Sequence, residues 1–504
     1  MRHKNNQNYS MKKLYILAAL FWTILINAQG EFITTWEITP FSGLTIEFPI
    51  VEDPTNNYTI SFGDGTTLTN QTGPTTHTYN AIGTYTIIVS GIFKRIKFYE
   101  SAYYSNFRIK TIQQWGTNQW TSMENAFRGC QNLSVLATDT PDLTQVTSTR
   151  FMFTGCFSGV NTIVNQINNW DVSNVTDMSY MFASAYGFNQ PIDSWDVSNV
   201  SNMQGMFLST THFNQPINSW DVSSVTNMSD MFGSNWDFNQ PINNWDVSNV
   251  IHMNGMFQNA ISFNQPLSDW NTGNVINMYM MFMRASSFNQ PLNNWNVSNV
   301  VSTHNMFNEA TAFNQPLNNW DVTNLLYTGQ MFRDASSFNQ DLSDWNVINA
   351  TEFINFLDRS GLDINNYDAL LDKFAALGLT NRVLGVEGLK YCNVTDRNIL
   401  INDLGWVITG DELNEDCSLG INKDSLKEKI LFYPNPAKDF VNFKAENGVA
   451  IKSIEIYNML GQKVMTISFI QSTTAVDVSG LSVGTYLTKV VTDDGNTIVK
   501  FIKE

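Results

Sequence analysis

Tryptophan recurs every 25 residues through the middle of this chain. The spacing holds without exception at eight positions, Trp170, Trp195, Trp220, Trp245, Trp270, Trp295, Trp320 and Trp345. A fixed period of this length is typical of repeat architectures, in which each copy is one small structural unit. A 25-residue unit cannot bury its apolar face alone, so neighbouring copies must stack and share one continuous core. The period therefore predicts a solenoid.

Each copy contains two hydrophobic patterns. The alternation of Trp195 and Val197 predicts a short strand with both side chains facing inward, and the later spacing of Val200, Met203 and Met206 predicts a helical or 3₁₀ arc. The recurrent Phe-Asn-Gln-Pro should be structural: Phe fills the core, Asn and Gln hydrogen-bond along the stack, and Pro fixes a turn. Less regular copies extend the expected array over residues 111–360, followed by a C-terminal cap over 361–418.

The flanking regions read as strands separated by turn residues. Residues 29–110 predict a small β-sandwich, residues 419–426 an acidic linker, and residues 427–504 a second β-sandwich. The expected fold class is mainly β with short helical arcs, a solenoid of about 25-residue rungs between two small sandwiches.

The N-terminus has the parts of a secretory signal over residues 1–28. Two lysines after Met11, the expected start, precede an apolar run and then Asn27-Ala28, where cleavage is expected. The run of about 13 residues is shorter than the roughly 20 that a membrane-spanning helix needs. We therefore expect an exported protein with no transmembrane segment in its mature chain.

The rung, together with Ala126-Phe127-x-x-Cys130 upstream, resembles the BspA-type leucine-rich repeat of bacterial surface proteins over about 120–360. It uses Trp, Val and Met where Leu is commoner. Gly63-Asp64-Gly65 and the tyrosine motifs that follow are similar to a PKD-like domain over 29–110.

The C-terminal region resembles the type IX secretion sorting domain of Bacteroidota. The residues that carry this resemblance are Tyr433, Pro434, Asn435, Pro436, Gly461, Gly484 and Tyr486. It implies handling by the type IX secretion machinery and a secreted or outer-membrane cell-surface location.

Charge excludes some partners and indicates a candidate surface. The formal net charge is −17, and removal of four basic residues with the signal makes it −21, which disfavours nucleic acid and anionic lipid. No lysine lies between Lys110 and Lys373, and between Trp170 and Trp345 there are 14 acidic residues against two basic ones. Outward carboxylates in register form an expected acidic ladder at Asp171, Asp196, Asp221, Asp246 and Asp321, with Asn at the other rungs.

Three interpretations of the ladder remain open. It is a solvated face that prevents self-association, a site for a basic or carbohydrate ligand, or a site for structural calcium. Calcium prefers six to eight oxygen ligands, of which one ladder supplies few. No other metal and no cofactor is expected.

The four cysteines of this exported chain invite disulfides. Cys130 and Cys156 occupy equivalent small, buried positions of adjacent rungs, so either a disulfide or two buried free thiols fits the spacing. Cys392 and Cys417 flank the cap and are the better candidates for a bridge.

The sequence favours a non-enzymatic protein. Gly480-Leu-Ser-Val-Gly484 matches a hydrolase pattern only by letter, because no strand-to-helix context surrounds it, and the histidines have no ligand spacing. We expect adhesion or protein recognition through the solenoid face. The alternatives are glycan capture, favoured by off-period aromatics such as Trp236 and Tyr279, and a passive structural coat.

Overall fold

A computed structural model describes residues 30–40, 43–159, 163–415, 417, 430–445, 450–459, 462–471, 473–492 and 495–504. The chain forms two compact units, Met1–Glu412 and Leu413–Glu504. Both are mainly β with few helices. The expected signal over 1–28 and the linker over 419–426 lie outside the described residues.

The first unit begins with two mainly antiparallel sheets, and buried side chains alternate along several of their strands. Their strands are β1 (Phe32–Ile38), β2 (Thr45–Phe48), β3 (Asn57–Ser61), β4 (Thr67–Gln71), β5 (Thr75–Thr78), β6 (Gly83–Ile92) and β7 (Ile109–Gln114), with the 3₁₀ turns η1 (Phe98–Glu100) and η2 (Ala102–Phe107) before β7. One sheet has the order β4-β3-β6-β1-β7-β8 and the other pairs β2 with β5. Because β7 spans the expected boundary at 110/111 and pairs in parallel with β8 (Ser134–Val135), this region runs directly into the repeat array.

Consecutive rungs of the array are joined by isolated parallel bridges that recur every 25 residues. The bridged residues are Asp177, Asn202, Asn227, His252, Asn277, Ser302, Tyr327 and Glu352. The bridge therefore lies seven residues after each tryptophan, and the strand expected at Trp195–Val197 is wrong. The reason is local: Asp196 accepts hydrogen bonds from Ser198, and the Val200 N–H donates to Val197 O at 2.9 Å, so this segment is a turn.

The expected helical arc is a run of consecutive turns. The Met206 N–H donates to Met203 O within the rung at 3.1 Å, whereas the N–H groups of Met203 and Ser209 donate to Asn227 O and Gly233 O of the next rung at 3.0 and 2.7 Å. Ser209 has a left-handed backbone with φ of 56°, and its equivalents in later rungs do as well. The turns thus direct alternate N–H groups along the stack.

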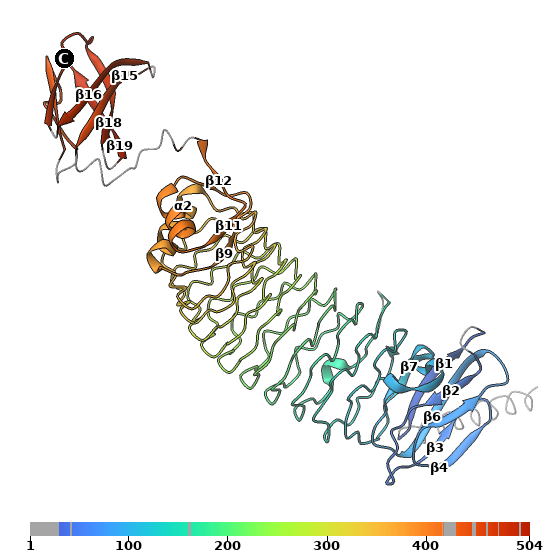
Figure 1. Ribbon diagram of the computed structural model, residues 1–504. Helices are drawn as coiled ribbons and strands as arrows, with labels where there is room; N and C mark the ends of the chain where they lie inside the picture. The colour runs from blue at the N-terminus through green and yellow to red at the C-terminus, as the bar shows by residue number, and fades with distance from the viewer. Residues whose placement is uncertain are drawn as a thin grey trace, which may run out of the picture. The chain divides into compact units, whose positions relative to one another are not determined.

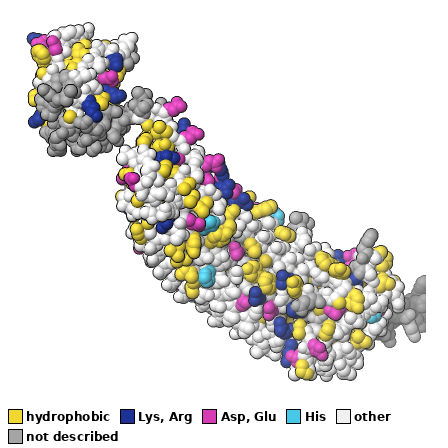
Figure 2. All heavy atoms as spheres, in the orientation of Figure 1, with side chains coloured by type: hydrophobic (Ala, Val, Ile, Leu, Met, Phe, Trp, Pro, Cys, Tyr) yellow, Lys and Arg dark blue, Asp and Glu magenta, His cyan; other side chains and the backbone are white. Residues whose placement is uncertain are grey.

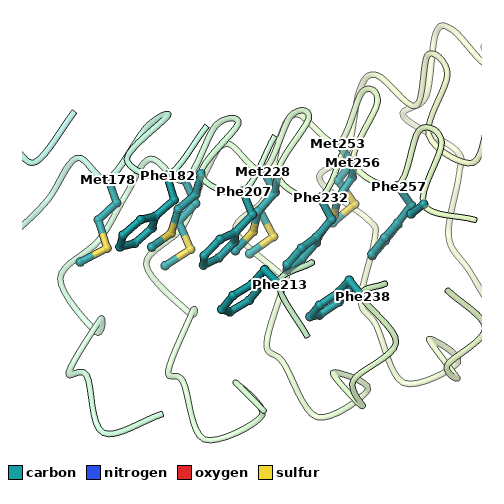
Figure 3. Close-up of a cluster of buried hydrophobic side chains, with 14 of the residues drawn as sticks. Met178, Phe182, Phe207, Phe213, Met228, Phe232, Phe238, Met253, Met256 and Phe257 are labelled. Carbon is teal, nitrogen blue, oxygen red and sulfur yellow. The ribbon is translucent and has the colours of Figure 1, made fainter. Parts of the chain in front are cut away.

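The core consists of aromatic columns. Figure 3 shows Phe182, Phe207, Phe232 and Phe257 in one row, with Phe213 in a second row. Rings one rung apart in the first row have centroids 5.6–5.8 Å apart and nearly parallel planes. The periodic tryptophans are buried, and from Trp195 onward each indole N–H donates to the preceding rung; for example, Trp220 Nε1 donates to Ile192 O at 3.0 Å. These contacts confirm that the repeated Phe, Met and Trp residues pack the interior.

An amide ladder runs beside the core. Asn214 Oδ1 accepts the Asn239 N–H at 3.0 Å and the Gln240 Nε2–H at 2.9 Å, and the same pair of bonds repeats at later rungs. This confirms the predicted hydrogen bonding by the Phe-Asn-Gln-Pro amides. The 3₁₀ turn η3 (Ile167–Asn169) lies at the start of the regular rungs.

A cap covers the last rung of the array (Figure 1). It contains α2 (Ile364–Leu377), β9 (Val383–Gly385), β10 (Lys390–Tyr391), α3 (Val394–Asn398), the π-helical turn η4 (Ile399–Asp403), β11 (Val407–Thr409) and β12 (Glu412–Leu413). Helix α2 begins at the N-cap Asp363, whose side chain accepts the Asn366 N–H, and ends at Gly378 with φ of 65°. Phe374 packs on Phe353 of the last rung with ring centroids 5.0 Å apart, which closes the core.

The second unit has its own core and two antiparallel sheets. One has the order β13-β14-β17 and the other β16-β15-β18-β19. The strands are β13 (Ile430–Tyr433), β14 (Phe440–Ala445), β15 (Ile451–Asn458), β16 (Lys463–Gln471), β17 (Thr473–Asp477), β18 (Gly484–Thr492) and β19 (Gly495–Lys503).

Candidate functional site

The predicted acidic ladder is exposed, but its carboxylates already have a structural role. In Asp171, Asp196, Asp221, Asp246 and Asp321, Oδ1 accepts the N–H of the residue two positions later at 3.0–3.1 Å. The hydrogen bond from the Ser or Thr hydroxyl, followed by that backbone N–H, holds the pKa of four of these carboxyls below its usual value, namely Asp196, Asp221, Asp246 and Asp321. Each aspartate therefore closes a local turn.

Asparagine closes the same turn in rungs where it replaces aspartate. Asn296 Oδ1 accepts the Ser298 N–H at 3.1 Å and its hydroxyl at 2.7 Å, and Asn271 Oδ1 accepts the Gly273 N–H at 3.2 Å. The position thus requires an acceptor oxygen and not a negative charge. Calcium would have to compete with these bonds for Oδ1. Among the described residues, no three His, Cys, Asp or Glu side chains are grouped as a metal site would require.

Some of the positions that differ between the rungs lie on another part of the surface. From Trp170 to Pro316 every rung keeps its tryptophan, its stacked phenylalanines and its Asn-Gln-Pro, with the rings in the core and the Asn and Gln amides along the ladder. In contrast, the residues fourteen and sixteen positions after each tryptophan change from rung to rung, between polar, charged, aliphatic and aromatic types. Such variation is what a recognition surface on a constant scaffold requires.

These variable positions line a groove of about 1360 Å³ that runs along the array. One column of its lining is Ser209, Ser234, Asn259, Arg284, Glu309 and Asp334, and the other is Tyr186, Thr211, Trp236, Ile261, Ser286 and Thr311. Five intervals at the spacing of the stacked Phe rings put its ends roughly 28 Å apart. Figure 2 shows few charged side chains on the visible face of the array and hydrophobic ones among uncharged polar atoms.

One end of the groove is aromatic. Tyr186 is 47% exposed and Trp236 is 49% exposed, whereas Thr211, between them in the same column, is only 9% exposed. The two aromatic side chains therefore project from the surface on either side of the nearly buried Thr211. Ile261, which is 44% exposed, extends the apolar strip by one rung.

The other end is charged but internally paired. Arg284 donates two hydrogen bonds, from Nε and one terminal nitrogen, to the Glu309 carboxylate, both at 3.0 Å. Arg359 donates two hydrogen bonds to the Asp334 carboxylate at 2.6 and 2.8 Å. The hydrogen bonds that Arg284 donates to Glu309 raise the pKa of Arg284, and those that Arg359 donates to Asp334 lower the pKa of Asp334. These charges neutralise one another along the column.

The rung that carries Trp236 also departs from the core pattern. Asn235 is fully buried where the rungs on either side have Thr210 and Ala260. Neither amide atom of Asn235 has a hydrogen-bond partner among the described residues. An unsatisfied buried amide costs about 1–3 kcal/mol, whereas Thr210 at the equivalent position donates its hydroxyl to Phe182 O at 2.6 Å.

The cysteines divide into two pairs. Cys130 and Cys156 are buried free thiols in adjacent rungs, and burial together with the contact with Cys156 raises the pKa of Cys130. Cys156 Sγ bonds Phe127 O at 2.9 Å. Cys392 and Cys417 are disulfide-bonded.

The predicted sorting residues are distributed over the second unit. Tyr433 ends β13 and is exposed, as are Pro434, Asn435 and Pro436 after it. Asn435 Oδ1 accepts the Ile502 N–H at 2.8 Å, which ties this segment to β19. Gly484 begins β18, and the buried Tyr486 stacks on Phe501 with ring centroids 5.5 Å apart. Gly461 lies outside the described residues.

Sequence reasoning noted Trp236 as an aromatic outside the period but missed the groove. The signal that could have found it is the contrast between constant and variable positions of the aligned rungs. Tyr279 is 37% exposed and lies outside the groove, where it stacks on His304 with ring centroids 5.7 Å apart. Among the described residues, no helix combines the length and the hydrophobicity needed to cross a bilayer.

Comparison with known families gives matches in three parts of the chain. Residues 38–92 match the PKD domain, and residues 431–504 match the family described as secretion system C-terminal sorting domain. A chain with this sorting domain is exported, to remain at the cell surface or to be released. No curated protein matches the chain significantly.

Five overlapping segments match one further family, over residues 96–158, 121–235, 153–268, 215–310 and 262–366. Its description names neither leucine-rich repeats nor adhesion, so both stay predictions. Because the segments together span 96–366, more than half of the chain, this protein belongs to the family described as Mycoplasma protein of unknown function, DUF285.

Proposed function

We propose that this chain is a non-enzymatic adhesion protein of the outer cell surface, whose solenoid of BspA-like rungs recognises an extracellular ligand through the groove. The observation that carries the proposal is the groove itself, a long hollow lined by the side chains that differ between rungs. The constant polar residues do not offer a comparable site, because their hydrogen-bonding groups are used within the array.

The organisation of the chain is consistent with recognition outside the cell. The sorting domain provides for export, and the array carries the recognition surface in a separate unit. Repeat scaffolds serve many ligands, so the fold by itself names none. The specificity must come from the side chains of the groove.

The test compares ligand binding by the full mature chain and two variants. In the groove variant, Trp236→Ser and Ile261→Ser replace the apolar strip by the residue that Ser286 already supplies in the same column. In the control variant, Asp196→Asn and Asp221→Asn retain the acceptor that closes each turn. Beads coated with each protein are applied to arrays of extracellular glycans and surface proteins, and the beads retained on each spot are counted.

We expect binding by the wild type and the control and a loss of binding by the groove variant. Loss in the Asp→Asn control with retention in the groove variant would move the site to the acidic ladder. No binding by any of the three proteins would support the passive coat instead.

A further inference from the structure

We infer that the groove binds a neutral polysaccharide, laid along the rungs with a sugar ring stacked on Trp236. The inference rests on the proposed function, since it takes the groove to be the binding site, and it adds the chemical class of the ligand. Three properties of the groove support the inference. The backbone N–H groups along one column are already hydrogen-bonded, the exposed side chains can contact sugars, and the charged side chains are paired.

The backbone beside the groove is already hydrogen-bonded. The N–H groups of Ser209, Ser234 and Asn259 donate to carbonyls of the next rung at 2.7, 2.6 and 2.7 Å, and those of the charged half of the column do so at 2.8 Å. An extended peptide that binds by adding a strand needs free backbone donors and acceptors. This column does not supply such donors, so a strand cannot add along it and its recognition groups are side chains.

The side chains have the chemistry of a sugar site. Trp236 and Tyr186 present large amphipathic rings, on which the C–H face of a pyranose can pack, and they lie two rungs, or roughly 11 Å, apart. Beside them, Ser209, Ser234 and Asn259 present hydroxyl and amide groups, which both donate and accept hydrogen bonds. Sugar hydroxyls require that combination.

The charges favour an uncharged ligand. Glu309 is held by Arg284, and Asp334 by Arg359. Near the aromatic end, Asp237 pairs with His212 at 2.8 Å. An anionic polysaccharide would meet the excess of acidic residues between Trp170 and Trp345, and a cationic one would find these carboxylates already paired.

The rung of Trp236 departs from the others at neighbouring positions. Asn235 is buried with both amide atoms unpartnered among the described residues, next to the exposed indole and Asp237. Neighbouring rungs show that Thr or Ala fills this position. The unpaired amide is therefore a departure that packing of the core does not require, and it lies where the aromatic end of the groove is built.

Affinity electrophoresis of the full mature chain tests the inference. The gels contain, one at a time, a neutral β-glucan, a mannan, a starch, anionic alginate or cationic chitosan. The variants are Trp236→Ser and, as matched control, Tyr327→Ser, because Tyr327 is also 49% exposed on the array but lies outside the groove. We expect at least one neutral polymer to retard the protein, Trp236→Ser to weaken that binding about tenfold or more, and Tyr327→Ser to leave it unchanged.

Binding of the charged polymers alone, no retardation by any neutral polymer, or equal retardation of wild type and Trp236→Ser would overturn the inference. A parallel array of extracellular proteins separates this failure from failure of the proposed function. Protein binding that Trp236→Ser abolishes, without polysaccharide binding, would keep adhesion through the groove and refute the glycan. Absence of both kinds of ligand would refute both proposals.

Discussion

Replacing Asn264 by Ala should destabilise the array through its amide ladder. Asn264 Oδ1 accepts the Asn289 N–H at 3.0 Å and the Gln290 Nε2–H at 2.9 Å. Alanine removes that acceptor and leaves the half-buried Asn289 N–H without this bond, while the Gln290 side chain keeps its second bond to Asn264 O. One lost bond and one unsatisfied N–H correspond to about 2 kcal/mol.

The melting temperature should fall by a few degrees. An unfolding entropy of about 2.1 cal/mol/K per residue over a unit of roughly 380 residues converts about 2 kcal/mol into about 2–3 °C. Urea titration followed by tryptophan fluorescence measures the free energy of unfolding.

The matched control is Asn249→Ser. Asn249 donates to Ser223 O at 2.8 Å from an exposed position, and the preceding rung has Ser224 at the equivalent place. This change should cost less than about 0.5 kcal/mol, as surface substitutions usually do. Equal free energies of unfolding for the Ala variant, the Ser control and the wild type would refute a stabilising role for the ladder.

Three further predictions concern single side chains. Asp221→Asn should match the stability of the wild type at pH 7 and lose less stability than the wild type below about pH 4. The folded pKa of Asp221 is lowered, so the stability that its carboxylate contributes is present above the unfolded pKa and is lost as pH falls through the folded pKa. Urea midpoints of both proteins at pH 7 and pH 3 test this. Cys130 and Cys156 should resist a thiol reagent in the native protein and react after denaturation, because both are buried; two rapidly titrating native thiols would contradict this. Asp411→Asn should lower the free energy of unfolding by about 3–5 kcal/mol, because the fully buried Asp411 carboxylate accepts two hydrogen bonds of 2.8 Å from Arg397. Calorimetry measures the change, and an unchanged melting temperature would show that the pair does not stabilise the cap.

The period of the tryptophans was enough to predict stacked rungs and a core of Phe, Met and Trp, because apolar burial depends mainly on spacing. It did not locate the bridge between rungs. The pattern Trp195-x-Val197 fits a strand and a turn equally, and the hydrogen bonds from Ser198 to Asp196, which the pattern does not contain, decide for the turn.

The groove was harder to predict than the core. Its two columns flank a buried residue such as Thr210, and Ser209 in the first column has a left-handed backbone. A hydrophobic period carries no information about the sign of φ. The acidic ladder was one candidate recognition surface, because its charges are evident in the sequence. The turns that use its oxygens are not evident there.

The inter-rung hydrogen bonds run both ways: the Ser201 N–H and the ladder amides donate to the preceding rung, and alternate N–H groups of the turns from Met203 to Ser209 donate to the next rung. The last rung finds its acceptors in the cap, where the Leu357 N–H donates to Gly385 O at 3.0 Å. The backbone hydrogen bonds between regular rungs therefore repeat from one junction to the next, whereas side-chain pairs such as Arg284 with Glu309 belong to a single junction. A 25-residue module added between two regular rungs would reproduce the backbone pattern and lengthen the groove by one step of 5.6–5.8 Å.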